Sequence, residues 1–230
     1  IIMINEKEKD ENNYKVEYLG EKHSHDLLSY KVIVLGLYGV GKTTIINKLM
    51  NKEIDKEYSP TISVDVKTVQ VKVNEKIIQI QIWDCCGNDE FALHTPNLFK
   101  NATAAILVYA INDINSFNDL KSWYNMLLNN SYCNIIFLIG NKSDLKDQRK
   151  VSIEDAENYK NNYDAFKMFF ETSAKKGENI DKLFENIAIS IYEKNEKEEK
   201  DLENAMNNDN KSLKITKKNH KKKMKKKWIC

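Results

Sequence analysis

Eight residues near the start of the chain, Gly36-Leu37-Tyr38-Gly39-Val40-Gly41-Lys42-Thr43, have the chemistry of a phosphate-binding loop. Glycines let the backbone curl so that successive N–H groups point at phosphate oxygens, and a helix N-terminus adds partial positive charge. In this pattern Lys42 reaches the β- and γ-phosphates, and the Thr43 hydroxyl ligates Mg²⁺. The pattern requires a strand before it and a helix after it, and the apolar run 30–35 and the helical pattern 42–51 supply both. The loop therefore predicts binding of a Mg²⁺–nucleotide.

A second polar motif, Asn141-Lys142-Ser143-Asp144, predicts which base is bound. The Asp144 carboxylate can accept two hydrogen bonds from the N1–H and N2–H₂ edge of guanine. Adenine lacks that donor pair and would leave a buried carboxylate unpaired, at a cost of about 1–3 kcal/mol or more. Lys142 can lay its stem along the base plane, and Asn141 can tie loops together. These residues favour GTP and GDP, and disfavour an ATP-using enzyme built on the same phosphate loop.

Strand-like and helical patterns alternate around these motifs, which indicates an α/β fold with a mostly parallel sheet covered on both faces. Continuous apolar runs are typical of central parallel strands, whereas alternating runs with Asn74-Glu75 between them predict an antiparallel hairpin. The predicted strands cover 30–35, 66–73, 76–83, 104–109, 135–139 and 168–170, and the predicted helices cover 42–51, 116–128, 153–163 and 180–191. We therefore expect a six-stranded sheet.

Composition divides the chain into three parts. Residues 1–29 are polar without periodicity and predict a mostly disordered arm, residues 30–194 form the predicted domain, and residues 195–230 form a charged tail. The net charge is only +2, yet ten lysines lie between Lys211 and Lys227 without an acid among them. None of the four cysteines has zinc-ligand spacing, which indicates a reducing compartment. No apolar run approaches the roughly 18–20 residues of a membrane span.

These motifs, in this order, resemble the small GTPases of the Ras superfamily, over about residues 30–194. Thr61 matches the switch I threonine that closes on Mg²⁺ and the γ-phosphate. Trp83-Asp84-Cys85-Cys86-Gly87 matches the D-x-x-G motif of switch II, in which Asp84 holds Mg²⁺ through water and the Gly87 N–H contacts the γ-phosphate. Glu171-Thr172-Ser173-Ala174-Lys175 matches the loop whose backbone amide, at Ala174, contacts the guanine oxygen.

The resemblance implies a P-loop NTPase fold and a defined set of site residues. The nucleotide-binding residues are Gly36, Leu37, Tyr38, Gly39, Val40, Gly41, Lys42, Thr43, Thr44, Thr61, Asp84, Gly87, Asn141, Lys142, Asp144, Ser173, Ala174 and Lys175. Thr43, Thr61 and Asp84 are the expected Mg²⁺ site. Asn88, Thr61 and Lys42 are the expected catalytic residues.

Within the superfamily the chain is most similar to the Rab family. The similarity lies in Gln81-Ile82-Trp83-Asp84, in Ala105-Ile106-Leu107-Val108-Tyr109, and in Ser116-Phe117 followed by Trp123. It implies a switch in vesicle-mediated transport. Its partners would be effectors, an exchange factor and a GTPase-activating protein that bind the switch regions, and no nucleic acid is expected. Val66 and Leu98 stand where Rab proteins place two members of an aromatic effector triad, and Trp83 is the third.

Two departures from the family bear on hydrolysis. Asn88 stands where a glutamine orients the attacking water, and its amide reaches about 1.5 Å less far, an error that can cost about 10²-fold in rate. Tyr38 replaces a small residue and could crowd an incoming arginine finger, which contributes about 10³–10⁵-fold. We therefore expect slow hydrolysis. The alternative is a hydrolysis-deficient adaptor that stays bound to GTP.

The C-terminus combines a polybasic run with Trp228 and the terminal Cys230. A basic cluster together with one lipid chain is a two-signal membrane anchor. Rab proteins are commonly geranylgeranylated on two C-terminal cysteines, whereas this chain offers only Cys230, with no C-a-a-X box. Prenylation of Cys230 would place the protein on the cytosolic face of an endomembrane. The other readings are a nuclear-localisation or nucleic-acid-binding basic tail, or a solvated tail with a chance cysteine.

Overall fold

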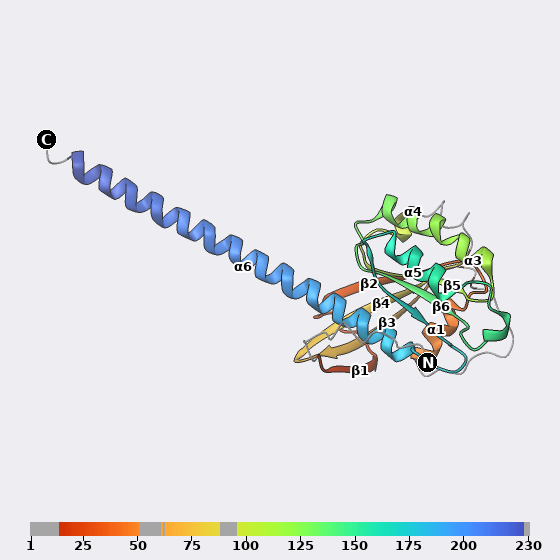
Figure 1. Cartoon of the computed structure of the whole chain (residues 1–230). Coiled ribbons are helices and arrows are strands. Elements are labelled where there is room, and N and C mark those ends of the chain that lie inside the picture. The colour runs from red at the N-terminus through yellow and green to blue at the C-terminus, as the bar shows by residue number, and fades with distance from the viewer. Residues whose placement is uncertain (1–13, 51–60, 62, 88–95, 228–230) are drawn as a thin grey trace, which may run out of the picture. The chain divides into compact units, whose positions relative to one another are not determined.

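The structure is a computed structural model, and it describes residues 14–50, 61, 63–87 and 96–227, with side chains described up to residue 206. One compact unit reaches Ile191, and a second begins at Tyr192. The first unit holds a seven-stranded sheet in the order β1-β3-β4-β2-β5-β6-β7 (Figure 1). The strands are β1 Val16–Glu21, β2 Ser29–Leu35, β3 Asp65–Val73, β4 Lys76–Asp84, β5 Ala102–Ala110, β6 Ile136–Asn141 and β7 Phe166–Glu171.

The parallel part of the sheet is made from the continuous apolar runs of the sequence. β2 pairs in parallel with β4 on one side and β5 on the other, and the parallel order continues to β6 and β7. Ile33, Leu107 and Leu138 point into a core completed by Trp123 and Leu127. Successive side chains along a strand point to opposite faces of the sheet. Val34 and Val108, which are equally buried, therefore lie on the face opposite to Ile33 and Leu107. Both faces of these strands are therefore removed from water, as the α/β prediction requires.

β3 and β4 form the expected antiparallel hairpin. Their register runs from Asp65 opposite Asp84 to Val73 opposite Lys76, and Asn74 in the turn has φ 53°. Asparagine tolerates this left-handed conformation, which suits a two-residue hairpin turn. The hairpin places Asp84 at the same sheet edge as the end of β2.

The expectation of six strands is wrong, because residues predicted as part of a disordered arm form the edge strand β1. β1 pairs antiparallel with β3, and the register shifts between Tyr18 and Gly20, where Gly20 has φ 94°. An edge strand gains its hydrogen bonds from the backbone, so its side chains need no apolar alternation. Residues 1–13 lie outside the described part of the chain. Two of the six strand pairings are antiparallel, so the sheet is less uniformly parallel than predicted.

A buried glutamine ties the segment after β1 to the sheet. The side-chain oxygen of Gln79 accepts from the backbone N–H of Ser24 at 2.7 Å. Its nitrogen donates to the Ser24 carbonyl at 3.2 Å and to the Ser29 hydroxyl at 2.6 Å. Gln79 is fully buried and has both ends of its amide satisfied. The segment between β1 and β2 is thereby integrated into the domain.

The helices are α1 Lys42–Leu49, α3 Ile114–Asn118, α4 Leu120–Asn130, α5 Ile153–Asn161 and α6 Ile180–Lys227. The helix predicted over 116–128 is in fact two, α3 and α4. The break lies at Asp119, whose carboxylate accepts a hydrogen bond from Trp123 Nε1 at 2.7 Å. α5 begins with a capping box between Ser152 and Asp155.

α6 begins on the domain and extends far beyond the predicted 180–191. Ile180, Leu183, Ile187 and Ile191 are buried at helical spacing. The second unit, described by itself, continues as helix to Lys227, and its described side chains are largely exposed. Among the described residues, no helix combines the length and the apolar character that crossing a bilayer demands.

Replacing Gln79 tests whether the segment after β1 is part of the stable fold. In Gln79→Ala the backbone groups of Ser24 lose their partners, so the free energy of unfolding should fall by about 1–3 kcal/mol. Urea denaturation measures this fall. The control is Gln81→Ala, on the same strand and part-exposed, with an expected change within about 0.5 kcal/mol. Equal effects in the two variants would contradict the role given to Gln79.

Candidate functional site

The predicted phosphate loop, residues 36–43, connects the end of β2 to the start of α1. Gly36, Gly39 and Gly41 have φ values of 137°, 74° and 98°, in the region that favours glycine. At Gly41 a side chain would also collide with the side-chain nitrogen of Asn141. The loop conformation and its contact with β6 therefore both require glycine at position 41.

Lys42 brings its charge inside this loop. Its Nζ donates to the Gly36 carbonyl at 2.8 Å and to the Leu37 carbonyl at 3.1 Å, and the side chain is buried. Burial lowers the pKa of Lys42, and the nearby Asp84 carboxylate opposes that shift. This arrangement of an ammonium group and backbone N–H groups is suited to binding phosphate, because the phosphate supplies negative charge to a buried positive one.

Three oxygen-bearing side chains meet beside Lys42. The Thr43 hydroxyl donates to Asp84 Oδ2 at 2.6 Å and lies 2.9 Å from the Thr61 hydroxyl. Asp84 is buried, and burial raises its pKa. Its Oδ1 has no hydrogen-bond partner among the residues that the structure describes. An unpartnered buried carboxylate oxygen beside two hydroxyls fits a hard cation such as Mg²⁺, which prefers oxygen ligands.

The candidate Mg²⁺ site offers few protein ligands. Among the described residues, no three His, Cys, Asp or Glu side chains cluster as a metal site. Mg²⁺ commonly uses one or two carboxylates together with waters and substrate phosphates. The predicted set of Thr43, Thr61 and Asp84 is of this kind, and the structure brings all three together.

The D-x-x-G motif touches the phosphate loop directly. The Tyr38 backbone N–H donates to the Gly87 carbonyl at 3.1 Å, and a side chain at 87 would collide with the Tyr38 backbone. The Tyr38 side chain is 68% exposed, so its ring stands at the surface of the loop. Asn88, the predicted water-orienting residue, lies outside the described residues.

Asn141 connects the phosphate loop to the predicted base-binding loops. Its side-chain nitrogen donates to the Val40 carbonyl at 2.8 Å. Its side-chain oxygen accepts from the Ala174 N–H and from the Thr172 hydroxyl, each at 3.2 Å. Asn141 is only 2% exposed, so these bonds form away from water. The structure thus gives Asn141 the loop-tying role that the sequence suggested.

The remaining predicted base-binding residues lie on the two loops that carry Asp144 and Ser173. Ser173 donates its hydroxyl to Asp144 Oδ1 at 2.6 Å, and Ser173 and Ala174 are buried. Lys142 is half-buried with φ 67°, and burial lowers its pKa. Lys175 is exposed. The Ser173 hydroxyl therefore holds the Asp144 carboxylate in place.

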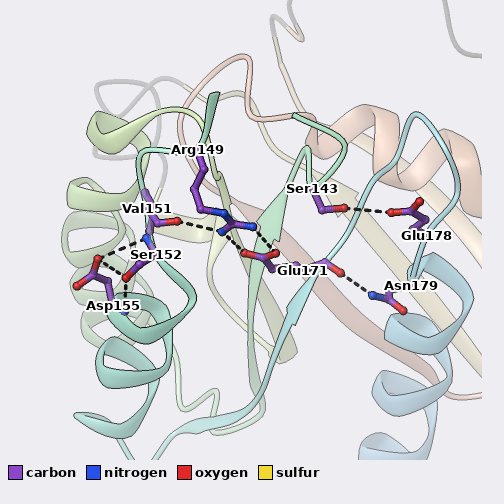
Figure 2. Close-up of polar contacts among 8 residues, drawn as sticks. All are labelled: Ser143, Arg149, Val151, Ser152, Asp155, Glu171, Glu178 and Asn179. Atoms are coloured by element: carbon purple, nitrogen blue, oxygen red, sulfur yellow. Dashed lines mark hydrogen bonds and ion pairs between the residues drawn. The ribbon is translucent and has the colours of Figure 1, made fainter. Parts of the chain in front are cut away.

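The sequence prediction missed several side-chain contacts that hold these loops in place. Arg149 forms an ion pair with Glu171, and Asn179 donates to the Glu171 carbonyl at 2.7 Å (Figure 2). Ser143, inside the Asn141–Asp144 motif, donates to Glu178 at 3.4 Å. The only available signal was the opposite charge of Arg149 and Glu171, which lie 22 residues apart.

Comparison with known families gives one finding. A family model described as "Ras family" matches residues 31–193, well over half of the chain. The match begins within β2 and extends through the domain part of α6.

Removing the Asn141 amide tests how far the site depends on it. In Asn141→Ala three buried hydrogen bonds are lost, so the free energy of unfolding should fall by about 2–4 kcal/mol. The matched control is Asn186→Ala, which removes a part-exposed asparagine that donates to the Lys182 carbonyl of its own helix. That variant should change stability by less than about 0.5 kcal/mol in the same denaturant titration. If the two losses were alike, Asn141 would not hold the loops.

Proposed function

The chain belongs to the Ras family, a family of small GTPases, and on that premise we propose that it is a Rab-like GTP/GDP switch in vesicle-mediated transport. The main support for guanine-nucleotide binding is that Asn141 joins the phosphate loop to the loop next to Asp144 by hydrogen bonds. A phosphate loop with Lys42 lies at one end, and Asp144, held by Ser173, lies at the other. Phosphate and Mg²⁺ bind at the first, and guanine is read at the second.

Binding of Mg²⁺·GTP would order the two switch regions in this mechanism. Thr43, Thr61 and Asp84 would hold Mg²⁺, which neutralises charge on the β- and γ-phosphates when bound. The Gly87 carbonyl accepts a hydrogen bond from the Tyr38 N–H of the phosphate loop, so the two segments lie against each other. Contact of the Gly87 N–H with the γ-phosphate would link the nucleotide state to the conformation of switch II.

The Rab assignment rests on motif similarity and on the surface that β3 and β4 offer. Val66 is 42% exposed and lies opposite Trp83 in the register of the two strands. Lys31 places its ammonium 3.7 Å from the centre of the Trp83 ring. Leu98, by contrast, is buried, so an effector cannot contact it at this position. Effector recognition would use Val66 and Trp83 with the switch regions, which differs from an aromatic triad.

Slow hydrolysis is the part of the proposal that depends on Asn88 and Tyr38. The exposed Tyr38 ring stands on the phosphate loop, where an arginine finger from a partner would approach. This observation also supports the second candidate, a GTP-bound adaptor that hardly hydrolyses. The two differ in whether the wild-type chain turns over GTP at all.

We further propose that the C-terminal lysines and a lipid on Cys230 hold the protein on the cytosolic face of an endomembrane. The support is the sequence of this segment, in which ten lysines precede the cysteine. Each lysine close to an anionic surface contributes about 1 kcal/mol, and one lipid chain alone binds only marginally.

Hydrolysis measured in single-turnover conditions tests the proposed role of Asn88. Wild type should hydrolyse bound GTP below the roughly 10⁻⁴ s⁻¹ of Ras-like enzymes, and Asn88→Gln should be faster by about 10-fold or more. The longer side chain restores the reach of the amide to the attacking water. The control is Asn88→Ala, which removes the amide and should be no faster than wild type. A wild-type rate at the ordinary level, unchanged in Asn88→Gln, would refute slow hydrolysis through Asn88.

The membrane anchor is tested by detergent partitioning of the protein from eukaryotic cells. Wild type should enter the detergent phase and Cys230→Ser should stay in the aqueous phase, because only the lipid supplies enough apolar surface. Cys133→Ser, which changes a buried thiol, is the control and should partition as wild type does. Aqueous partitioning of wild type would exclude the lipid.

A further inference from the structure

Glu171 is the last residue of β7 and directly precedes the base-binding loop, residues 172–178. That loop carries Ser173, which holds Asp144, and Ala174, which contacts Asn141. The position of Glu171 therefore sets where the loop begins. Any residue that fixes Glu171 acts on the base-reading groups from outside the nucleotide site.

Arg149 donates two parallel hydrogen bonds to the Glu171 carboxylate. Its two terminal nitrogens lie 2.5 Å from Oε1 and 2.8 Å from Oε2, and the first also donates to the Val151 carbonyl at 3.0 Å (Figure 2). A bidentate arginine–carboxylate pair fixes orientation as well as distance. The hydrogen bond to Glu171 also raises the pKa of Arg149. Both side chains are largely shielded from water, so salt weakens this pair less than a surface pair.

The other end of the loop is fixed by its own contacts. Asn179, with φ 60°, donates its side-chain nitrogen to the Glu171 carbonyl at 2.7 Å. Ser173 and Glu178 exchange backbone hydrogen bonds at 3.2 and 3.0 Å, which closes the loop on itself. Ser143 donates to the Glu178 carboxylate at 3.4 Å. These bonds tie the two ends of the loop to each other and to Glu171.

Arg149 lies on the segment that follows Asp144, whereas Glu171 leads into Ser173. The ion pair therefore spans the same two segments as the hydrogen bond between Ser173 and Asp144, 2.6 Å long. A change in the separation of the two segments would therefore strain the Ser173–Asp144 bond and turn the Asp144 carboxylate. Small errors in the position of a recognition group cost selectivity disproportionately.

We propose that Arg149 and Glu171 are positioning residues that set the selectivity of this chain for guanine, although neither is among the residues expected to bind the nucleotide. The proposal rests on the proposed guanine-nucleotide function. Loss of the pair lets the base-binding loop shift relative to Asp144, so the contact with the 2-amino group of guanine weakens. The phosphate and Mg²⁺ contacts, which come from other loops, stay as they are.

The test compares affinities for GDP and inosine diphosphate, which lacks only the 2-amino group, in the full chain with Mg²⁺. The measured quantity is the ratio of the two dissociation constants. In Glu171→Gln the preference for GDP should fall by about 5- to 10-fold relative to wild type, while affinity for inosine diphosphate changes little. Arg149→Lys keeps the charge but loses the fork, so its ratio should lie between those of Glu171→Gln and wild type.

The matched control is Ser152→Ala, which removes the capping box of α5 close to Arg149 without touching Glu171. It should lower Tm yet leave the ratio at the wild-type value. If Glu171→Gln and Arg149→Lys lower Tm but leave the ratio unchanged, the pair is structural only and the proposal is overturned. If wild type binds GDP no more tightly than ADP, the guanine function itself fails, and the positioning role fails with it.

Discussion

The side-chain amide of Asn141 is the constraint on which the arrangement of the site depends. It donates to the carbonyl of Val40 in the phosphate loop and accepts from Thr172 and Ala174 in the base-binding loop. A carboxylate could not make the donor bond, and an apolar side chain would leave all three partners unpaired in the interior. The asparagine therefore fixes the distance between the group that binds phosphate and the group that reads the base.

The two ends of the site differ in how their charges are satisfied. At the base end, Asp144 is held by Ser173, and its surroundings are held by Arg149 and Glu171. At the phosphate end, Lys42 is buried on backbone carbonyls, and one oxygen of Asp84 has no partner within the described part of the chain. Buried charges of this kind lower the stability of the domain unless a ligand of opposite charge pairs with them. Nucleotide and Mg²⁺ are thus expected to stabilise the domain as well as switch it.

The parts that were predictable from sequence are those with strong local patterns. Apolar runs predicted the parallel strands. The glycine-rich loop and the Asn141–Asp144 motif predicted the two ends of the nucleotide site. β1 was missed because an edge strand gains its hydrogen bonds from backbone and carries no apolar alternation. Gln79 is a polar residue on a strand of alternating character, yet it is fully buried, because the backbone of Ser24, 55 residues away in sequence, pairs with its amide.

Other misses have the same origin in long-range contacts or in weak local signals. The break at Asp119 lies inside a continuous helical pattern without Gly or Pro, so nothing local signals it. The Arg149–Glu171 pair joins segments that are separated by a helix and a strand. The helix beyond Ile191 has no buried stripe among its described residues, so apolar periodicity could not reveal it. Local chemistry could thus be predicted, whereas the contacts that position it could not.

The central claim is that this chain binds guanine nucleotide through its phosphate loop and Asp144. The most direct test is to purify the protein gently in the presence of Mg²⁺, denature it and identify the released nucleotide by chromatography. The account predicts GDP or GTP at roughly one molecule per chain, since such sites bind tightly enough to survive purification. Release of ATP or ADP at the same stoichiometry would contradict it.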